Sequence, residues 1–214
     1  MGVRLRVLAV LILVVAVGIA PPLVAKCVPK HTLRIVMRYD GPDVPKDHFI
    51  RQPKTLYRSG ETLGRMEEEA NRETGIRLLV VVNGADLWMV NLMTNTGEHA
   101  IDPDPTPAFR APIIGDMKSD YWNNFEFGCE VPFMESAGAT KTKIDGGTLY
   151  EHTHDGATAR LTVSERGLPK HVSVTKGDTE FSFVYDAYEQ IVEPNPTLFA
   201  KPAGVRFTEA PVQQ

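Results

Sequence analysis

The stretch that decides the fold is Val80-Val-Val-Asn-Gly-Ala-Asp-Leu-Trp-Met-Val-Asn-Leu92. Its Asn83-Gly84 pair favours the two-residue turn of a β-hairpin, because both residues tolerate the positive φ that such a turn needs. The strands on either side are Ile76–Val82 and Leu87–Leu92. Ile76–Val82 is almost continuously apolar, which is typical of a strand covered on both faces. The stretch therefore predicts a hairpin in the middle of an antiparallel sheet.

Alternation of apolar and polar residues continues on both sides of this hairpin. Further strands are predicted at 33–39, 55–59, 63–69, 99–102, 149–154, 159–164, 171–175 and 179–188. Helical periodicity is scarce, and the one predicted helix, Tyr121–Ala137, is interrupted by Pro132. The fold class is therefore mainly β: one strongly curved antiparallel sheet with little helix.

The N-terminus predicts export. Arg4 and Arg6 precede an uncharged apolar run, Val7–Ala20, which Pro21 and Pro22 end. A basic start, a short apolar core and a helix break are typical of a secretory signal. We expect residues 1–25 to be the signal, cleaved after Ala25, and the protein to work in the periplasm or otherwise outside the cytoplasm. An uncleaved membrane anchor is the alternative.

Residues 26–214 suit one domain with a sizeable core and no membrane span. Without the two arginines of the signal, 21 basic residues would face 27 acidic ones, so nucleic acid is not expected as a partner. The only cysteines are Cys27 and Cys129. In an oxidising compartment this pair predicts a disulfide; a free, buried Cys129 is the alternative.

His152-Thr-His154 is the sharpest candidate for a metal site. Residues two apart on a strand point to the same face, so both imidazoles can reach one cation. A third ligand must come from elsewhere, such as His171 on a following strand. The competing interpretation is that His152 and His154 belong to the solvent face of a hairpin.

Two acidic motifs and a proline-rich segment are assigned to the surface. Glu67-Glu68-Glu69 is interpreted as a solvated acidic edge, with Glu67 and Glu69 on one face. Asp102-Pro-Asp104-Pro lacks the glycine and the distal glutamate of a calcium loop and is interpreted as a turn. Residues 103–112 hold four prolines and predict a loop or an edge excursion.

No recognised nucleophile elbow or phosphate-binding loop occurs in the chain. The sequence therefore predicts no catalytic residue and no cofactor, and we do not expect an enzyme.

Three segments carry a family resemblance: Val80–Leu92, with its turn and its Trp-bearing strand; Glu165–Val174, with Gly167-Leu168-Pro169; and Asn195–Phe207, with a closing Phe-x-x-Pro-x-Gly-Val. In this order, behind a signal, they resemble the LolA/LolB-like superfamily of periplasmic lipoprotein-sorting carriers. The resemblance implies an unclosed antiparallel barrel whose minor helix acts as a lid over an apolar concavity that holds acyl chains. The family's long helix before the first strand is missing here, and no binding residue is carried over.

The leading hypothesis is a non-enzymatic periplasmic carrier or binding protein for an apolar ligand, such as an acyl chain, a lipid or the lipid moiety of a lipoprotein. The candidate ligand-binding wall residues are Leu33, Ile35, Met37, Trp88, Val90, Phe181 and Phe183. For Trp88 and Trp122 the alternative interpretation is that each is an ordinary core aromatic. The alternatives are a structural or interaction module for envelope proteins, with a core filled by its own side chains, and a metal-binding protein.

Overall fold

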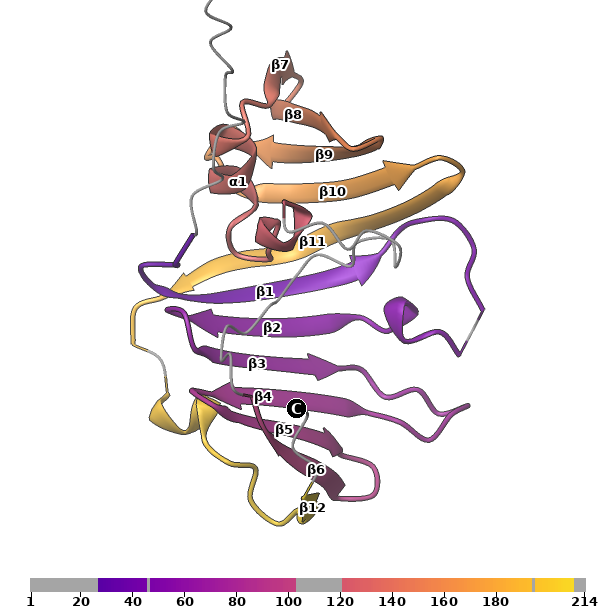
Figure 1. The fold of residues 1–214 in the computed structure, drawn as a ribbon, viewed down its shortest axis with the longest axis vertical. Helices are drawn as coiled ribbons and strands as arrows, with labels where there is room; N and C mark the ends of the chain where they lie inside the picture. Colours follow the sequence, from indigo (N-terminus) through magenta and orange to yellow (C-terminus); the bar gives the residue numbers. More distant parts are fainter. Residues whose placement is uncertain (1–26, 46, 103–120, 194, 210–214) are drawn as a thin grey trace, which may run out of the picture.

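The computed structural model describes residues 27–45, 47–102, 121–193 and 195–209 (Figure 1). They form one twelve-stranded sheet in the order β12-β6-β5-β4-β3-β2-β1-β11-β10-β9-β8-β7. The strands are β1 (Thr32–Tyr39), β2 (Lys54–Ser59), β3 (Leu63–Glu68), β4 (Leu78–Asn83), β5 (Asp86–Asn91), β6 (Thr96–Ile101), β7 (Thr140–Ile144), β8 (Gly147–His154), β9 (Ala157–Ser164), β10 (Pro169–Lys176), β11 (Thr179–Ile191) and β12 (Arg206–Glu209). A 3-10 turn, η1 (Phe49–Arg51), precedes β2.

The predicted fold class is confirmed: the chain is mainly β, and its curved sheet stays open as an unclosed barrel with a minor helix. Neighbouring strands pair antiparallel, except that β12 pairs parallel with β6. The predicted hairpin is present, but its two-residue turn is Gly84-Ala85, because Asn83 ends β4 and pairs with Asp86; Gly84 has a φ of 59°. β7 and β12 are the two strands that the pattern did not predict.

The sheet has an inner face and an outer face, which we define by the side chains of β1. Leu33, Ile35 and Met37 point to the inner face, where the larger core lies. This core also takes up apolar side chains of β2 and of β8–β11, including Leu56, Leu161 and Phe183. The alternation read from the sequence is therefore the division between these two faces.

The segment that immediately precedes β7 covers part of the inner face of the sheet. We call residues 121–137 the plug. It holds η2 (Trp122–Asn124) and α1 (Glu130–Ser136), and α1 contacts β8 and β9 (Figure 1). Its fully or largely buried side chains are Trp122, Phe125, Phe127, Phe133 and Met134.

The helix is shorter than predicted. The sequence predicted one helix over Tyr121–Ala137, and the structure has a 3-10 turn and then a seven-residue α-helix. Pro132 does not interrupt α1, because it lies in the first turn, where a missing N–H costs no intrahelical hydrogen bond. Gly138, at a φ of 70°, follows the helix in the left-handed conformation.

A second, smaller core lies on the outer face. It consists of Leu79, Val81, Trp88 and Val90. Residues 195–209, which we call the strap, contribute η3 (Pro196–Phe199) and β12, and Val205 and Phe207 of the strap pack on this core. The expectation that Ile76–Val82 is covered on both faces is correct for Leu79 and Val81 on the outer face and for Val82 on the inner face, but not for the rest of the strand. Leu78 and Val80 on the inner face are half-buried, and Ile76 is exposed.

The predicted disulfide is present: Cys27 and Cys129 are bonded across a sequence separation of 102 residues. It fixes the chain before β1 to the residue that precedes α1. The predicted signal at 1–25 and the proline-rich segment 103–112 lie outside the described residues. Among the described residues, no helix has the length and apolar character needed to span a membrane.

Candidate functional site

The inner face of β3, β4 and β5 is apolar and only partly covered. Its apolar side chains, which we call the inner-face patch, are Met66, Leu78, Val80, Val82, Leu87 and Met89. Met66 packs against the larger core, so the patch continues that core across the sheet. Met89, at the far side, is 37% exposed. Apolar side chains that face the interior of an open sheet and stay partly exposed are a candidate binding surface.

One row of paired residues shows how the cover changes along the sheet. Register aligns Ile35, Leu56, Met66, Val80 and Met89 side by side on the inner face. Ile35 and Leu56 are buried, Met66 and Val80 are half-buried, and Met89 is exposed. The exposure therefore rises with distance from the plug.

The predicted wall residues fall into two groups. Leu33, Ile35, Met37 and Phe183 lie together in the larger core, and Phe181 packs against it. Trp88 and Val90 lie in the smaller core on the outer face, beneath the strap. The structure brings the first five together and does not bring Trp88 or Val90 to them. The inner face of β5 carries Leu87 and Met89 instead.

A buried carboxylate anchors the plug. Glu130, the first residue of α1, is 1% exposed and accepts hydrogen bonds from the Tyr185 hydroxyl (2.8 Å), the Tyr188 hydroxyl (3.2 Å) and the Gly128 amide (2.9 Å). Burial raises the pKa of Glu130, and these hydrogen bonds act in the opposite direction. Burial beside Glu130 also raises the pKa of both tyrosines. Three donors on one buried carboxylate make the start of α1 a fixed point of the inner face.

A β-bulge in β11 makes this arrangement possible. β1 pairs Val36 with Ala187 and Met37 with Tyr185, so Asp186 is an extra residue on β11. Without it, two tyrosines three residues apart would point to opposite faces. With it, both reach Glu130.

Arg58 holds the same segment from the sheet side. Its side chain is 3% exposed, ion-pairs with Glu126 and donates to the carbonyl of Phe127 (2.9 Å). It also lies 3.5 Å from the carbonyl of Cys27. Together with the disulfide, Arg58 and Glu130 attach the plug where it enters α1.

The two candidate metal ligands are engaged by the plug. The Tyr121 hydroxyl lies 2.5 Å from Nε2 of His152, and the Tyr121 ring stacks on His154 at 3.7 Å between centroids. Burial, with a further contribution from His154, lowers the pKa of His152. His171, the suggested third ligand, bonds Ser182 instead at 2.6 Å. Within the described ranges, no three His, Cys, Asp or Glu side chains are grouped as a metal site would require.

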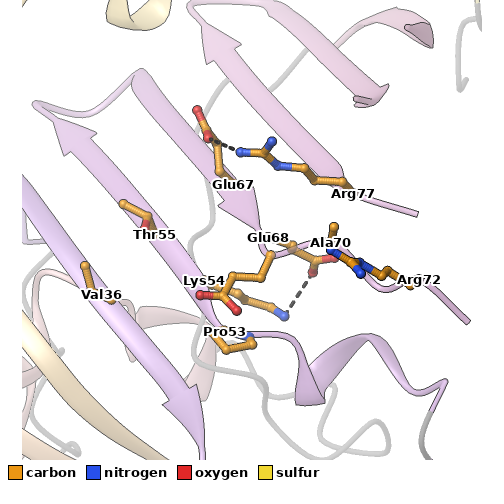
Figure 2. A pocket seen from close by; sticks show the side chains of 10 residues that line it. Val36, Pro53, Lys54, Thr55, Glu67, Glu68, Ala70, Arg72 and Arg77 are labelled. Carbon is orange, nitrogen blue, oxygen red and sulfur yellow. Dashed lines mark ion pairs between the residues drawn. The ribbon is translucent and has the colours of Figure 1, made fainter. Parts of the chain in front are cut away.

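A polar pocket of about 380 Å³ opens at one end of β2 and β3 (Figure 2). Its lining residues are Val36, Pro53, Lys54, Thr55, Glu67, Glu68, Glu69, Ala70, Arg72 and Arg77. Lys54 and Glu68 form an ion pair of 2.9 Å with both side chains more than nine-tenths buried. Burial lowers the pKa of Lys54, and the adjacent Glu68 carboxylate opposes that shift. Glu67 contacts Arg77 at 3.7 Å and also pairs with Arg65.

This pocket corrects the interpretation of Glu67-Glu68-Glu69 as a solvated edge. Glu69 is exposed and Glu67 is half-buried, but Glu68 is buried against Lys54. The separation of Lys54 and Glu68 in sequence hides the pairing, which the β2–β3 register creates by placing them opposite each other. Arg58 and Glu130 were missed for the same reason, since nothing local marks a charged residue as buried.

Comparison with known proteins finds only distant similarity. No family model and no curated protein matches the chain. An uncharacterized conserved protein from Thermus thermophilus aligns over 85% of this chain and 91% of its own length, with 9% identity and a TM-score of 0.49. PNGF-II aligns over 84% of this chain and 31% of its own length, with 9% identity and a TM-score of 0.36. Similarities this low carry no argument about function.

Proposed function

We propose that the protein is a non-enzymatic, extracytoplasmic carrier or binding protein for an apolar ligand such as an acyl chain, and that it is a distant relative of the LolA/LolB-like carriers. The observation that carries the proposal is the inner-face patch. It adjoins the larger core, it is apolar over three adjacent strands, and it remains partly exposed.

The energetics of an alkyl chain suit such a surface. Each buried methylene contributes about 0.8 kcal/mol, so a chain of roughly ten carbons needs no ionic or catalytic group to bind. The patch offers six apolar side chains on three strands about 4.8 Å apart, and its length from Leu78 to Val82 is about 13 Å. These dimensions fit one extended chain laid along the strands.

The proposal is tested with protein purified from the periplasm of its own host. Native mass spectrometry and solvent extraction should recover a bound lipid, and a neutral fluorescent apolar probe should bind the delipidated protein. Absence of both the lipid and probe binding would contradict the proposal.

A matched pair of variants distinguishes probe binding at this surface from non-specific probe binding elsewhere on the protein. Met89→Glu places a charge on the inner-face patch, and Ile101→Glu places one at a similarly exposed position on the outer face of β6. We expect Met89→Glu to weaken probe binding about tenfold or more, because a buried unpaired charge is costly, and Ile101→Glu to leave it unchanged. Equal effects of the two variants would locate binding elsewhere.

A second candidate function is a structural or interaction module for envelope proteins. The filled part of the inner face favours it, because aromatic side chains of the plug occupy the space over β1 and β8–β11. If this is the function, the delipidated protein should capture no apolar probe, and Met89→Glu should leave its stability and probe response unchanged.

A further inference from the structure

The plug is attached to the inner face at two places that differ in chemistry. At its α1 end it is held by the Glu130 carboxylate, the Arg58 guanidinium and the disulfide. At its η2 end it lies on two imidazoles of β8, those of His152 and His154. Imidazole is the side chain whose charge changes nearest to neutral pH. The two ends should therefore respond differently when the pH falls.

Tyr121 and Trp122 make the contacts at the η2 end. The Tyr121 hydroxyl lies 2.5 Å from Nε2 of His152, and the Tyr121 ring is stacked on the ring of His154. The indole Nε1 of Trp122, which is fully buried, donates to the main-chain carbonyl of His154 at 3.3 Å. Docking of η2 thus depends on the charge state of the two imidazoles.

A positive charge on His152 has no carboxylate to compensate it among the described residues. Its neighbour across the β8–β9 ladder is Ala159. Asp155 lies 3.4 Å from Nε2 of His154, whereas no described carboxylate forms an ion pair with His152. The other charged groups on the surrounding elements have partners of their own: Glu130 with Tyr185 and Tyr188, Glu135 with Lys141 and Tyr150, and Glu151 with Arg160 on the outer face. Protonation of His152 therefore places an uncompensated, half-buried charge beneath Tyr121.

The pKa of His152 has the direction that this environment requires. Burial, with a further contribution from His154, lowers the pKa of His152 below its ordinary value. An undocked imidazole has a pKa of about 6.5, so the docked state binds the proton more weakly than the undocked state. Docking is therefore strongest above about pH 6.5 and weakens as the pH falls from there through the lowered pKa. Within that interval, each pH unit raises the ratio of undocked to docked η2 by up to about tenfold.

We propose that protonation of His152 releases Tyr121 and η2 from β8 while α1 stays docked. Acidification then opens the plug at one end and uncovers the inner face of β8 and β9 around Ala157 and Ala159, both of which are fully buried when η2 is docked. The release needs no bound ligand, so it does not depend on the proposed function. Its consequence is a larger uncovered apolar area on the inner face at acidic pH.

The test is amide hydrogen exchange of the disulfide-bonded full chain from about pH 7.5 to about pH 5.5, with EDTA present and with rates corrected for the intrinsic effect of pH. The reporters at η2 are the amides of Asn124 and Phe125, which close the 3-10 turn. The reporters at α1 are the amides of Phe133 and Ala137, which bond within the helix. Between about pH 6.5 and about pH 5.5, we expect the protection of the η2 reporters to fall about fivefold to tenfold. The protection of the α1 reporters should stay unchanged.

Three variants show whether His152 is the group that titrates. His152→Gln keeps a polar side chain beside the Tyr121 hydroxyl but takes up no proton, so it should remove the pH dependence at η2. His171→Gln is the matched control, because His171 lies on the outer face of β10 and bonds Ser182, and it should behave as the wild type. Tyr121→Phe removes only the hydroxyl and should lower the protection of the η2 reporters severalfold even at about pH 7.5.

Three results overturn the proposal. The first is protection at η2 that stays constant as the pH falls. The second is an equal loss of protection at η2 and α1, since acid would then loosen the whole plug. The third is that the pH dependence persists in His152→Gln or disappears in His171→Gln. Should His152→Gln fail to fold, Tyr121→Phe decides the matter, because wild-type protection at η2 in that variant would show that the contact with His152 does not hold η2.

Discussion

The inner face of β1 and β9–β11 and the inner face of β3–β5 are both apolar, but they are covered differently. The first is closed by the plug, whose aromatic side chains are buried against it. The second keeps half-buried and exposed side chains, although its outer face is closed by the strap. One sheet thus contains a fully covered core and a partly exposed apolar surface. The difference teaches that apolar composition alone does not tell whether a face is part of the core or a binding surface.

The largest expected effect is on the free energy of unfolding, when the Glu130 carboxylate that anchors the plug is removed. Glu130→Ala leaves the two tyrosine hydroxyls and the Gly128 amide without their acceptor, and stranding buried polar groups costs about 3–5 kcal/mol in total. Urea unfolding should show a fall in the free energy of unfolding of this size. Glu135→Ala, on the exposed side of the same helix, should cost about 0.5 kcal/mol or less. Similar costs for both would mean that Glu130 does not hold the plug.

A smaller effect compares the two faces of one strand. Val81 is fully buried beneath the strap, while Val80 is half-buried on the inner-face patch. Val81→Thr buries a hydroxyl and should lower the free energy of unfolding by about 1–3 kcal/mol. Val80→Thr should cost about 0.5 kcal/mol or less, yet weaken binding of an apolar probe. If Val80→Thr were as destabilising as Val81→Thr, the inner face of β4 would be ordinary core.

The smallest effect concerns the strap and depends on pH. His99 on β6 lies 2.7 Å from Asp86 and 2.8 Å from Glu209 on β12, with Trp88 stacked on its ring. Carboxylates only accept, so both contacts are hydrogen bonds only when both ring nitrogens carry protons. The hydrogen bond to Asp86, helped by Glu209, raises the pKa of His99.

Because the folded pKa of His99 is the higher one, its stabilisation is fully present below the unfolded pKa of about 6.5 and is lost as pH rises through the folded pKa. Amide exchange of β12, corrected for the intrinsic effect of pH, should therefore speed up across this range. His99→Gln should remove that pH dependence. A variant that keeps it would show that another group controls the docking of β12.

Local signals were sufficient for most strands and for the disulfide. The β4–β5 hairpin and the alternation in β1 and β11 need only neighbouring residues, so they could be predicted, although the turn lies one residue later than Asn83-Gly84. β12 was missed because a four-residue parallel strand has no turn partner and takes its place from β6. The helix was overextended because the aromatics of the plug are buried by tertiary contacts, not by a helical face.

The candidate site was less predictable than the fold. Period two places Trp88 and Leu87 on opposite faces, but it does not say which face is inner, so Trp88 and Val90 were grouped with residues that lie on the other side of the sheet. The buried pair Lys54–Glu68 joins two strands through their register. The bulge at Asp186, which turns Tyr188 toward Glu130, has no sequence signal of its own.

The sequence by itself determined that this chain is a mainly antiparallel β protein with a hairpin around Gly84. It also determined that apolar and polar residues alternate along most strands. The tertiary structure alone decided which apolar set is covered, by the plug on one side and the strap on the other. The physical reason is that strand formation depends on local periodicity and turn chemistry. Cover, in contrast, depends on which distant segments pack on each face, and that is set by the order and register of the strands.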